Sequence, residues 1–544
     1  MKTVIIGGVA AGMSAATRLR RLDENAEIVI FEMGENVSYA NCGLPYFISD
    51  VISKRDALLL QTPRSLHARF RLDVRVRNKV TQINAAAKFV TVQNLETREV
   101  FDESYDKLVI TTGARPRRLD IPGIDRALFL RDVADADEIK AAVNHATDKT
   151  AVVLGAGFIG VEVAENLRKL GFTVSLVQRG SSILAGFDLE MIEPMQKRLE
   201  ENGVSLYLNA DAASVSQSHV VLATGEQLPA AVVVSAVGVE PDNALAKAAG
   251  LKIGSTGGLW VDAQQRTSDP NIFAAGDAVE KQGMLVGDSA LIPLANLANR
   301  HGRLIADVIA GLEVKAHDAI GTAIIGAFGM VVAKTGLSER EAKAANIKHS
   351  VIHVHPNNHA TYYPGASRVS LKIVFDSVSG KILGAQGVGE DGVDKRIDVI
   401  ATAIYAGLKI DELMDLELSY APQFGSAKDA INMAGYVGNN VQHHTTPTIQ
   451  WHELETAMQT GAQLIDVRTS TENAAGSIDG AILIPVDELR DRIAEINRAN
   501  VIVHCAVGQR GHIATQILRA HGIEVRNLDG GYTTWRSGQD ALVR

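Results

Sequence analysis

The stretch TAVVLGAGFIGVEVAENLRKLGFTVSLVQR, residues 150–179, decides the fold of this chain. A short apolar run leads into the spacing G-x-G-x-x-G, and a helical segment and a second apolar run follow. Gly155 permits a tight turn, Gly157 lets a pyrophosphate approach the backbone, and Gly160 allows close packing of helix on strand. The helix N-terminus then offers N–H groups to the phosphates. The stretch predicts a strand–turn–helix–strand unit that binds a dinucleotide.

The N-terminus carries a second copy of this arrangement in TVIIGGVAAGMSAATRLRRL (3–22) and AEIVIFE (26–32). Val9 replaces the middle glycine, but Glu32 ends the second strand about 20 residues after the turn, where a carboxylate can hold ribose hydroxyls. A surface glutamate that merely ends a strand is the alternative interpretation. The predicted cofactor contacts of this copy are Gly7, Gly8, Ala11, Gly12 and Glu32.

In the unit at 150–179 the corresponding strand ends at Gln178 and Arg179, with no carboxylate. We expect Gln178 to contact the cofactor. An arginine at this place tolerates a 2′-phosphate, so the sequence leaves NADH and NADPH both open.

Length and composition bound the remaining possibilities. The chain has 544 residues, which suggests roughly three to four domains. The formal net charge of -9 argues against general affinity for nucleic acids. Two cysteines make no disulfide framework, and neither a signal peptide nor an apolar run of about 18 residues is present, so we expect a cytoplasmic protein without a membrane span.

The segment AAGDAV places Asp277 after a strand and before an expected helix, and YDKLVITTGARPR places Thr112 and Gly113 in a turn after another strand. With the two glycine turns, these motifs resemble the two-dinucleotide flavoproteins of the pyridine nucleotide-disulfide oxidoreductase family over about residues 1–440. The resemblance implies FAD in the first unit and NAD(P)H in the second. It also implies that Asp277, with Ala278, binds the ribityl chain and that Thr112 and Gly113 close over the flavin site.

The expected fold class is α/β: a two-dinucleotide-binding flavoprotein fold with an α+β dimerisation domain and a C-terminal α/β domain. The polar stretch VGNNVQHHTTPT separates the last two and reads as a linker. The predicted domains are FAD-binding at 1–111 and 268–320, NAD(P)H-binding at 112–267, dimerisation at 321–440, linker at 441–450 and C-terminal at 451–544.

Cys42 lies in NCGLPY (41–46), where Pro45 suits the first turn of a helix. A thiol near a helix N-terminus is expected to have a lowered pKa. Phe47 stands where dithiol reductases of this fold carry a second cysteine, so Cys42 would cycle through a mixed disulfide, a persulfide or a sulfenic acid. Simple packing of a buried cysteine is the alternative.

NCGLPY, HATYYPGA and LSYAPQFGSAKD resemble the coenzyme A-disulfide reductases. The resemblance implies that Tyr362 and Tyr420 reach the flavin–sulfur site of the partner subunit in a homodimer, with Tyr363 as a rival for Tyr362. The arginines of the first helix (Arg18, Arg20, Arg21) are otherwise a solvated face, although guanidinium suits a phosphate-rich ligand. The implied substrate contacts are Ser14, Arg18, Arg21, Ser38, Asn41, Asn299, Arg300 and Lys428.

NADH oxidases and peroxidases share this fold and its single cysteine, which they cycle as a sulfenic acid. They usually carry a histidine in the first glycine turn, where this chain has Ala10. The absence of that histidine argues against peroxide chemistry.

The second cysteine lies in VIVHCAVGQRGHIAT, which with DVRTSTENAAGSIDGAILIP and NLDGGYTTW resembles a rhodanese domain. Backbone N–H groups of the six-residue loop from Cys505 to Arg510 are expected to stabilise a thiolate and its persulfide, and Arg510 adds positive charge. Asp466 and Arg468 are expected to brace the loop. A silent rhodanese-like fold usually lacks the cysteine.

Together these features predict a flavin-dependent NAD(P)H:CoA-disulfide/persulfide oxidoreductase with a sulfurtransferase domain. FAD and NAD(P)H are the expected cofactors, coenzyme A a substrate or tightly bound, and no metal is expected. Cys42 is the predicted redox nucleophile and Cys505 the sulfur carrier, assisted by Tyr362, Tyr420 and Arg510. A persulfide is favoured over a plain disulfide because a rhodanese domain has no evident use in disulfide cleavage. A redox-sensing sulfur-carrier protein with vestigial reductase activity is the alternative from another class.

Overall fold

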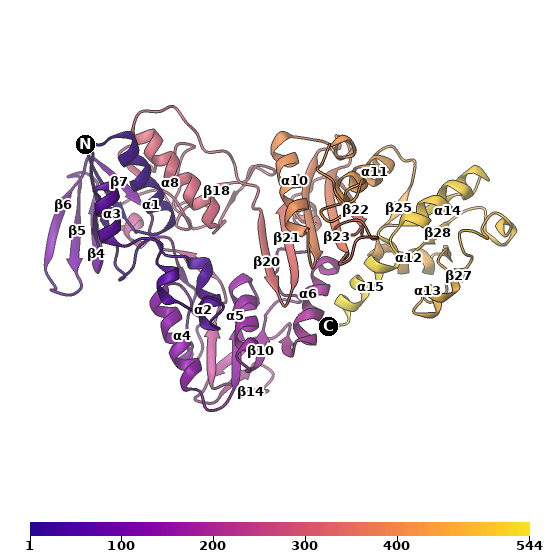
Figure 1. Ribbon diagram of the computed structural model, residues 1–544, viewed down its shortest axis with the longest axis horizontal. Helices are drawn as coiled ribbons and strands as arrows, with labels where there is room; N and C mark the ends of the chain where they lie inside the picture. The colour runs from indigo at the N-terminus through magenta and orange to yellow at the C-terminus, as the bar shows by residue number, and fades with distance from the viewer. The chain divides into compact units, whose positions relative to one another are not determined.

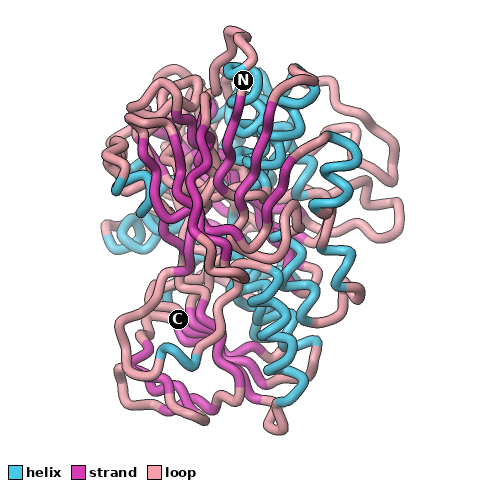
Figure 2. Tube along the Cα trace, turned by 90° about the vertical axis from the view of Figure 1, so that its left-hand side faces the viewer, coloured by secondary structure: helices cyan, strands magenta, loops and turns pink.

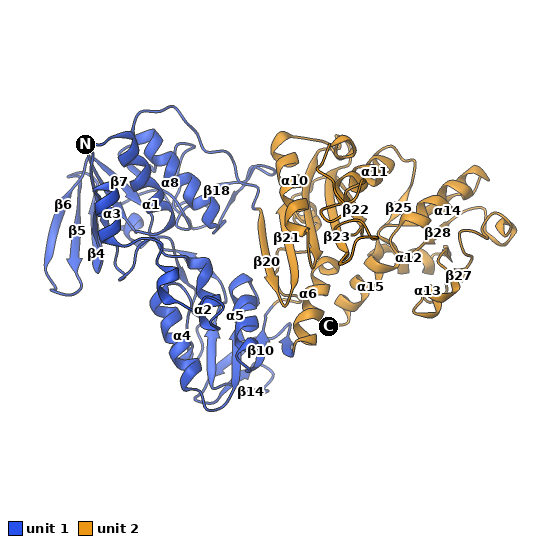
Figure 3. Cartoon of the chain, in the orientation of Figure 1, with its two compact units in different colours: residues 1–179, 203–321 blue, residues 180–202, 322–544 orange.

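The computed structural model describes residues 1–544 and divides into two compact units (Figure 3). The first unit is Met1–Arg179 with Gly203–Gly321, and the second is Gly180–Asn202 with Thr322–Arg544. Figure 1 labels the helices and strands, and Figure 2 shows that the strands gather into sheets with helices beside them. The second unit takes helix α6 (Leu189–Glu201) from within the sequence of the first. None of the helices is both long enough and apolar enough to cross a membrane.

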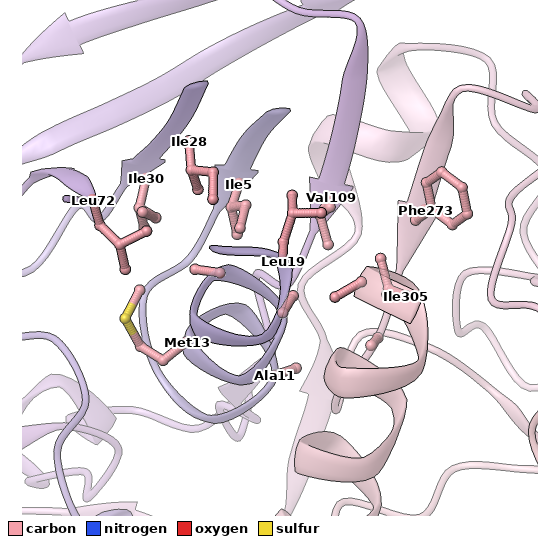
Figure 4. Close-up of a cluster of buried hydrophobic side chains, with 14 of the residues drawn as sticks. Ile5, Ala11, Met13, Leu19, Ile28, Ile30, Leu72, Val109, Phe273 and Ile305 are labelled. Carbon is pink, nitrogen blue, oxygen red and sulfur yellow. The ribbon is translucent and has the colours of Figure 1, made fainter. Parts of the chain in front are cut away.

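The first sheet of the first unit has five parallel strands in the order β17–β7–β1–β2–β3. Its side chains alternate between two cores: Ile5 packs with Leu19 of α1 and Ile305 of α8 (Figure 4), while Val4 and Ile6 face the other side. The alternation is the period of a strand buried on both faces. The strands are β1 (Lys2–Ile6), β2 (Glu27–Phe31), β3 (Asp73–Arg75), β7 (Lys107–Ile110) and β17 (Ile272–Ala274), and the helices are α1 (Ala10–Leu22) and α8 (Ala295–Ile309).

A second parallel sheet, in the order β11–β10–β9–β15, follows the same plan. Its β9–α5–β10 segment repeats β1–α1–β2, so the predicted duplication of the dinucleotide unit is confirmed. The elements are β9 (Thr150–Leu154), β10 (Thr173–Val177), β11 (Val204–Tyr207), β15 (Val232–Ser235), α4 (Val133–His145) and α5 (Phe158–Lys169). Two three-stranded antiparallel sheets accompany the first unit. One is formed by β4 (Asn78–Asn84), β5 (Phe89–Asn94) and β6 (Val100–Ser104), and the other by β12 (Ala212–Val215), β13 (His219–Leu222) and β14 (Gln227–Pro229).

Short elements complete the first unit. Two of them, η1 (Asn41–Gly43) and α2 (Leu44–Ile48), carry and follow Cys42. The others are η2 (Arg55–Leu58), α3 (Pro63–Phe70), β8 (Ala114–Pro116), η3 (Ile124–Arg126), β16 (Val239–Pro241), α7 (Ala244–Ala248), β18 (Lys281–Gln282) and β19 (Ser289–Ala290).

The second unit begins with an antiparallel sheet in the order β20–β21–β24–β23–β22. Helix α10 (Val393–Ala406) packs on β24 and β21. Helix α11 (Ala430–Gln442) starts at a capping box in which the Asp429 side chain accepts the backbone N–H of Ile431. The remaining elements are β20 (Ala323–Ala327), β21 (Met330–Gly336), α9 (Glu339–Ala344), β22 (His349–Val354), β23 (Val369–Asp376), β24 (Ile382–Gly389) and η4 (Asp411–Asp415).

The C-terminal domain of this unit is a parallel sheet in the order β25–β29–β28–β26–β27 with helices around it. The predicted linker at 441–450 is held against this domain, because Arg519 donates to the carbonyl oxygens of His444 and Thr445. The elements are β25 (Thr448–Ile449), η5 (Trp451–Glu453), α12 (Leu454–Gln459), β26 (Gln463–Asp466), α13 (Ser470–Ala474), β27 (Ile482–Leu483), η6 (Ile493–Glu495), β28 (Val501–His504), α14 (Gln509–Ala520), β29 (Val525–Leu528) and α15 (Gly531–Leu542).

Candidate active sites

The turn between β1 and α1 is shaped for the close approach of a phosphate. Gly7 has φ +101°, and a Cβ there would lie 2.3 Å from the carbonyl oxygen of Thr111. A Cβ on Gly12 would lie 2.0 Å from the carbonyl oxygen of Gly7. Because the N-cap residue, Val9, has no capping side-chain bond, the first N–H groups of α1 are left for a ligand. The turn that holds Gly8 and Ala11 therefore fits a pyrophosphate.

Glu32 follows β2 directly and turns its carboxylate toward this turn. Its two oxygens accept the backbone N–H groups of Gly8 and Gly34, each at 2.8 Å. These contacts place a carboxylate beside the glycine turn, where the ribose of a bound dinucleotide would need one.

The ends of β7 and β17 are neighbours, since these strands pair in parallel. Thr112 and Gly113 follow β7, and Asp277 and Ala278 follow β17, so the four residues lie at one edge of the sheet. The helix expected after Asp277 is wrong. The residues form a turn, which Lys281 holds by donating to the carbonyl oxygens of Gly276 and Val279 at 2.6 and 2.9 Å. Burial lowers the pKa of Lys281 to about 8.

The second glycine turn has the same construction. A Cβ on Gly160 would lie 1.9 Å from the carbonyl oxygen of Gly155, whereas a Cβ on Gly157 would meet open space. The α5 N-terminus again lacks a side-chain cap. The side-chain oxygen of Gln178 accepts the N–H of Ala156 at 3.1 Å, which fixes the amide beside the turn. Open space at Gly157 with close packing at Gly160 fits a bound dinucleotide.

Cys42 is exposed on η1, and α2 begins two residues later with Pro45 in its first turn. The expected lowering of the thiol pKa is wrong for the chain itself. Protein atoms packed around the sulfur exclude part of its water, and this partial burial raises the pKa of Cys42. The negative charges of Glu162 and Asp277 raise it further. A helix as short as α2 contributes too little to reverse this.

Two residues beside Cys42 were not predicted. The hydroxyl of Tyr46 donates to Glu162 of α5 at 3.0 Å, and burial raises the pKa of Glu162. The two residues are 116 positions apart, so no local pattern could have paired them.

The proposed coenzyme A contacts of the first unit lie mainly on α1 and α8. Ser14 donates to the side-chain oxygen of Asn299 at 2.6 Å, so these two residues lie together. Arg18 pairs with Asp307 at 2.6 Å. Arg20 is buried and donates to backbone carbonyl oxygens, so a wholly solvated arginine face is wrong. Arg21 and Arg300 are exposed, and Ser38 and Asn41 are half-buried. The backbone N–H of Ser38 donates to Gly8 at the first glycine turn.

The tyrosine motifs lie in the second unit. The hydroxyls of Tyr362 and Tyr420 are 2.9 Å apart, and both side chains are exposed. The hydrogen bond to Tyr420 raises the pKa of Tyr362. Tyr363 instead packs edge-on against His359, with ring centroids 5.7 Å apart, which favours Tyr362 as the partner of Tyr420. Lys428 is exposed.

Cys505 directly follows β28 and is 1% exposed. Its loop turns at Gly508, which has φ +92°, and Arg510 lies in the first turn of α14. The guanidinium of Arg510 is held by both carboxylate oxygens of Glu472, at 2.8 and 2.6 Å. Glu472 also closes the capping box of α13 with Thr469. Glu472 was not predicted, although T-x-x-E at 469–472 is a capping-box signature.

Asp466 and Arg468 brace the segments that contact the Cys505 loop. Arg468 forms a buried ion pair with Asp466, at 2.7 Å, and donates to the carbonyl oxygen of Gly476. Its guanidinium also lies 4.3 Å from the ring centroid of Tyr532, whose backbone N–H donates to Cys505. The pair thus fixes both the segment that carries Glu472 and the segment beneath Cys505.

Two dinucleotide turns, a free cysteine in the first unit and an antiparallel sheet after them define the class of the two-dinucleotide flavoproteins. Residues 1–302 match the pyridine nucleotide-disulphide oxidoreductase family, residues 323–430 its dimerisation domain, and residues 450–538 the rhodanese-like domain. The chain belongs to the pyridine nucleotide-disulphide oxidoreductase family and carries a C-terminal rhodanese domain, as its sequence predicts.

Three proteins are similar to this chain over most of its length. Coenzyme A disulfide reductase of Staphylococcus epidermidis is 33% identical over 436 residues, which are 80% of this chain and 99% of that protein. The structure of reduced Bacillus anthracis CoADR-RHD is 43% identical with a TM-score of 0.97, covering 99% of this chain and 98% of that one. A NAD-dependent persulfide reductase from A. fulgidus is 35% identical with a TM-score of 0.92, covering 98% and 100%. The family implies binding of FAD and NAD(P)H.

Proposed function

We propose that this protein is an NAD(P)H- and FAD-dependent reductase of coenzyme A persulfide, polysulfide or disulfide, coupled to sulfur transfer by its rhodanese domain. The observation that carries the proposal is the lone, exposed Cys42 of the first unit. It lies where the Asp277 carboxylate acts on it electrostatically, and Phe47 occupies the place of a second thiol. A thiol that has no internal partner must form its covalent intermediate with the substrate.

The cofactors have defined places in this proposal. The turn of Gly7, Gly8 and Gly12, together with Glu32 and Asp277, would hold FAD. The turn of Gly155, Gly157 and Gly160 would hold NAD(P)H. Bound FAD supplies the redox chemistry, because it can accept the electron pair of NAD(P)H and pass it to a sulfur.

The chain's own part in the reaction is nucleophilic. The Cys42 thiolate attacks the sulfur–sulfur bond of coenzyme A persulfide, a Cys42–S–S–CoA bond forms, and hydrosulfide leaves. An electron pair and a proton then restore Cys42 and release coenzyme A. The sum is CoA–SSH + NADH + H⁺ giving CoA–SH, H₂S and NAD⁺. With a coenzyme A disulfide, the products are instead two coenzyme A thiols.

Cys505 has the complementary role of loading sulfur. Its thiolate takes the outer sulfur from a sulfane donor such as thiosulfate, releases sulfite and becomes a persulfide. The thiol of coenzyme A then accepts that sulfur, which restores Cys505 and forms coenzyme A persulfide. The Arg510 guanidinium, held by Glu472, stabilises the negative charge of this persulfide.

Resemblance to coenzyme A-disulfide reductases extends the proposal to a homodimer. The paired hydroxyls of Tyr362 and Tyr420 would donate protons or hydrogen bonds at the flavin–sulfur site of the partner subunit, and exposed Lys428 would hold substrate. An unfilled apolar groove of about 370 Å³ along α10 supports association with a second chain. The groove is lined by Asp398, Val399, Thr402, Ala403, Ala406, Leu408, Leu416 and Leu418.

An NADH oxidase that works through a Cys42 sulfenic acid is the second candidate, and the exposure of the thiol favours it. Anaerobic incubation with coenzyme A disulfide, an acid quench and mass spectrometry separate the two. We expect coenzyme A attached to Cys42. An unmodified Cys42 after this treatment, together with rapid NADH consumption in air, would support the oxidase instead.

The nicotinamide site has its own test. Gly157→Val adds a side chain where space is open, so it is expected to raise the KM for NADH at least about tenfold without lowering the melting temperature. Gly326→Val is the control, because Gly326 lies on β20 in the second unit, has no positive φ, and a Cβ there would make only ordinary contacts, the nearest at 3.7 Å. An unchanged KM in Gly157→Val would remove the second glycine turn from the proposed cofactor site.

A further inference from the structure

A buried group of charged residues joins the dimerisation sheet to the rhodanese domain and has no role in the chemistry proposed above. His353 of β22 is 2% exposed. Its Nδ1 lies 2.7 Å from an oxygen of Asp529, and its Nε2 lies 3.2 Å from an oxygen of Glu190 on α6. The backbone N–H of His353 donates to the other oxygen of Asp529 at 3.2 Å. Because β22 is an outer strand, Asp529 satisfies an N–H that β23 cannot reach.

Asp529 begins a short segment, residues 529–533, that we call the strap. On one side of the strap, a Cβ on Gly530 would lie 2.8 Å from the Cβ of His353. On the other side, a Cβ on Gly531 would lie 2.4 Å from the carbonyl oxygen of Cys505, to which the N–H of Tyr532 donates at 2.8 Å. The N–H of Thr533 donates to Ala506 at 2.9 Å. The strap therefore touches His353 and the sulfur-carrier loop at once.

The charges around His353 come from every element packed against it. Asp529 faces it from the strap, Glu190 from α6, Lys372 from β23 and His355 from its own strand. Burial alone would lower the pKa of His353, but the two carboxylates outweigh burial and raise it to about 9. Beside His353, an acidic cluster is formed by Asp188, Glu190 and Glu339. The Lys372 ammonium lies in this cluster, 2.9 Å from Asp188 and 2.6 Å from Glu339. His353 is thus a buried cation at neutral pH, matched by Asp529.

We propose that His353 positions the Cys505 loop for sulfur transfer by fixing Asp529 and the strap, so that the dimerisation domain completes the sulfurtransferase site. The inference rests on the sulfur-transfer role proposed for Cys505. His353 itself touches no reacting atom and acts only through Asp529. A rhodanese domain with a loosened strap would keep its cysteine and lose the fixed loop around it.

The positioning depends on pH in a defined direction. His353 gains a partner on folding and its pKa rises, so its contribution is complete below its unfolded pKa of about 6.5. The contribution is lost as pH rises through about 9, where the folded imidazolium gives up its proton. Gln450, which donates to Asp529 and to the carbonyl oxygen of Val351 at 3.2 Å each, remains in place at high pH. The strap therefore loosens without leaving the sheet.

The test compares His353→Leu with His353→Asn in the full-length flavin-loaded protein. Leucine keeps the volume without a donor, whereas the Asn amide nitrogen takes the place of Nδ1 and can still donate to Asp529. With thiosulfate and cyanide, we expect His353→Leu to lower kcat about tenfold with little change in KM. His353→Asn should recover only part of that loss, because its amide donates to Asp529 without the positive charge of the imidazolium. Iodoacetamide should alkylate Cys505 faster in His353→Leu and at an unchanged rate at Cys42. His349→Leu, on the same strand but away from Asp529, is the matched control.

A His353→Leu protein that keeps wild-type kcat and wild-type alkylation of Cys505 overturns the proposal. If His353→Leu fails to bind flavin, His353→Asn decides: wild-type kcat should fall as pH rises through about 9, and this fall should be absent in His353→Asn. A fall of equal size in both proteins also overturns the proposal. A wild type that transfers no more sulfur than Cys505→Ser defeats the proposed function alone, because the alkylation rates still report the position of the loop.

Discussion

The two cysteines of this chain have opposite surroundings. Cys505 is buried at the end of a strand, in a loop braced by Glu472, Arg468 and the strap, with a guanidinium beside it. Cys42 is exposed on a one-turn element, and the charges that act on it are carboxylates, which together with burial raise its pKa. The protein thus surrounds one sulfur with braced segments and a guanidinium, and leaves the other exposed near carboxylates.

This difference explains why the two thiols can serve different chemistry. Under the proposed function, a persulfide on Cys505 would be stabilised by the Arg510 guanidinium that Glu472 holds in place, so sulfur could be carried there without a cofactor. Under the proposed function, the Cys42 thiolate would gain its stabilisation from what binds beside it, and the first glycine turn would hold that group.

The largest expected effect separates the two sites outright. Cys42→Ser should reduce NADH-dependent cleavage of coenzyme A disulfide at least about a thousandfold, because a hydroxyl cannot replace the thiolate nucleophile. The same variant should keep the transfer of sulfur from thiosulfate to cyanide. Cys505→Ser should show the reverse pattern, measured by the same two assays. Loss of both activities in either variant would break the comparison, because the sites would then act as one.

The next effect concerns the packing beneath the sulfur-carrier loop. Gly531→Ala is expected to lower sulfur transfer about tenfold or more, since its Cβ would press against the carbonyl oxygen of Cys505 at 2.4 Å. Gly461→Ala controls for backbone strain, because Gly461 also has positive φ in this domain but a Cβ there meets open space. Equal losses in the two variants would show that strain alone, and not contact with Cys505, limits the loop.

A smaller effect is expected from the ion pair that orients Arg510. Glu472→Gln should lower sulfur transfer about three- to tenfold, because a neutral amide holds guanidinium less firmly than a carboxylate does. Glu495→Gln disrupts an exposed arginine pair elsewhere in the domain and should have no effect. Wild-type activity in Glu472→Gln would contradict a role for the pair.

The same pair has a pH signature. Arg510 lowers the pKa of Glu472 to about 2, so its stabilising contribution is complete above the ordinary glutamate pKa and is lost as pH falls through 2. Thermal unfolding of wild type and Glu472→Gln should therefore converge in acid and differ most near neutral pH. A difference that stays constant down to pH 2 would exclude this ion pair as its source.

The smallest effect tests the acidic surroundings of Cys42. Glu162→Gln removes one of the charges that raise the thiol pKa, so the pH profile of Cys42 alkylation should move to lower pH. The rate at neutral pH should rise about two- to fivefold, as expected for a like charge near a protein surface. Glu96→Gln removes an exposed carboxylate that does not act on Cys42 and serves as the control. An unchanged profile in Glu162→Gln would mean that Glu162 does not contribute to this pKa, and that burial and Asp277 account for its rise.

Much of this organisation follows from local sequence patterns. Glycine spacing and strand periodicity predict both dinucleotide units. Gly155 and Gly160, for example, are required by the backbone conformation of a turn that spans only a few residues. The rhodanese loop is predictable for the same reason. What could not be predicted depends on contacts between distant segments, such as Tyr46 with Glu162 and His353 with Asp529, which are 116 and 176 positions apart.

The wrong expectation for the pKa of Cys42 has the same cause. A helix N-terminus near Cys42 is a local feature, but the pKa of the thiol is set by burial and by carboxylates from α5 and from the turn after β17. The helix expected after Asp277 gives way to a turn that Lys281 fastens from the following strand.

The most direct measurement follows sulfide release from coenzyme A persulfide with NADH under anaerobic conditions, in wild type and in Cys42→Ser. We predict one hydrosulfide released for each NADH oxidised by the wild type, and no NADH-dependent release by Cys42→Ser. Release by Cys42→Ser at the wild-type rate would contradict the claim that the single thiol of the first unit breaks the sulfur–sulfur bond.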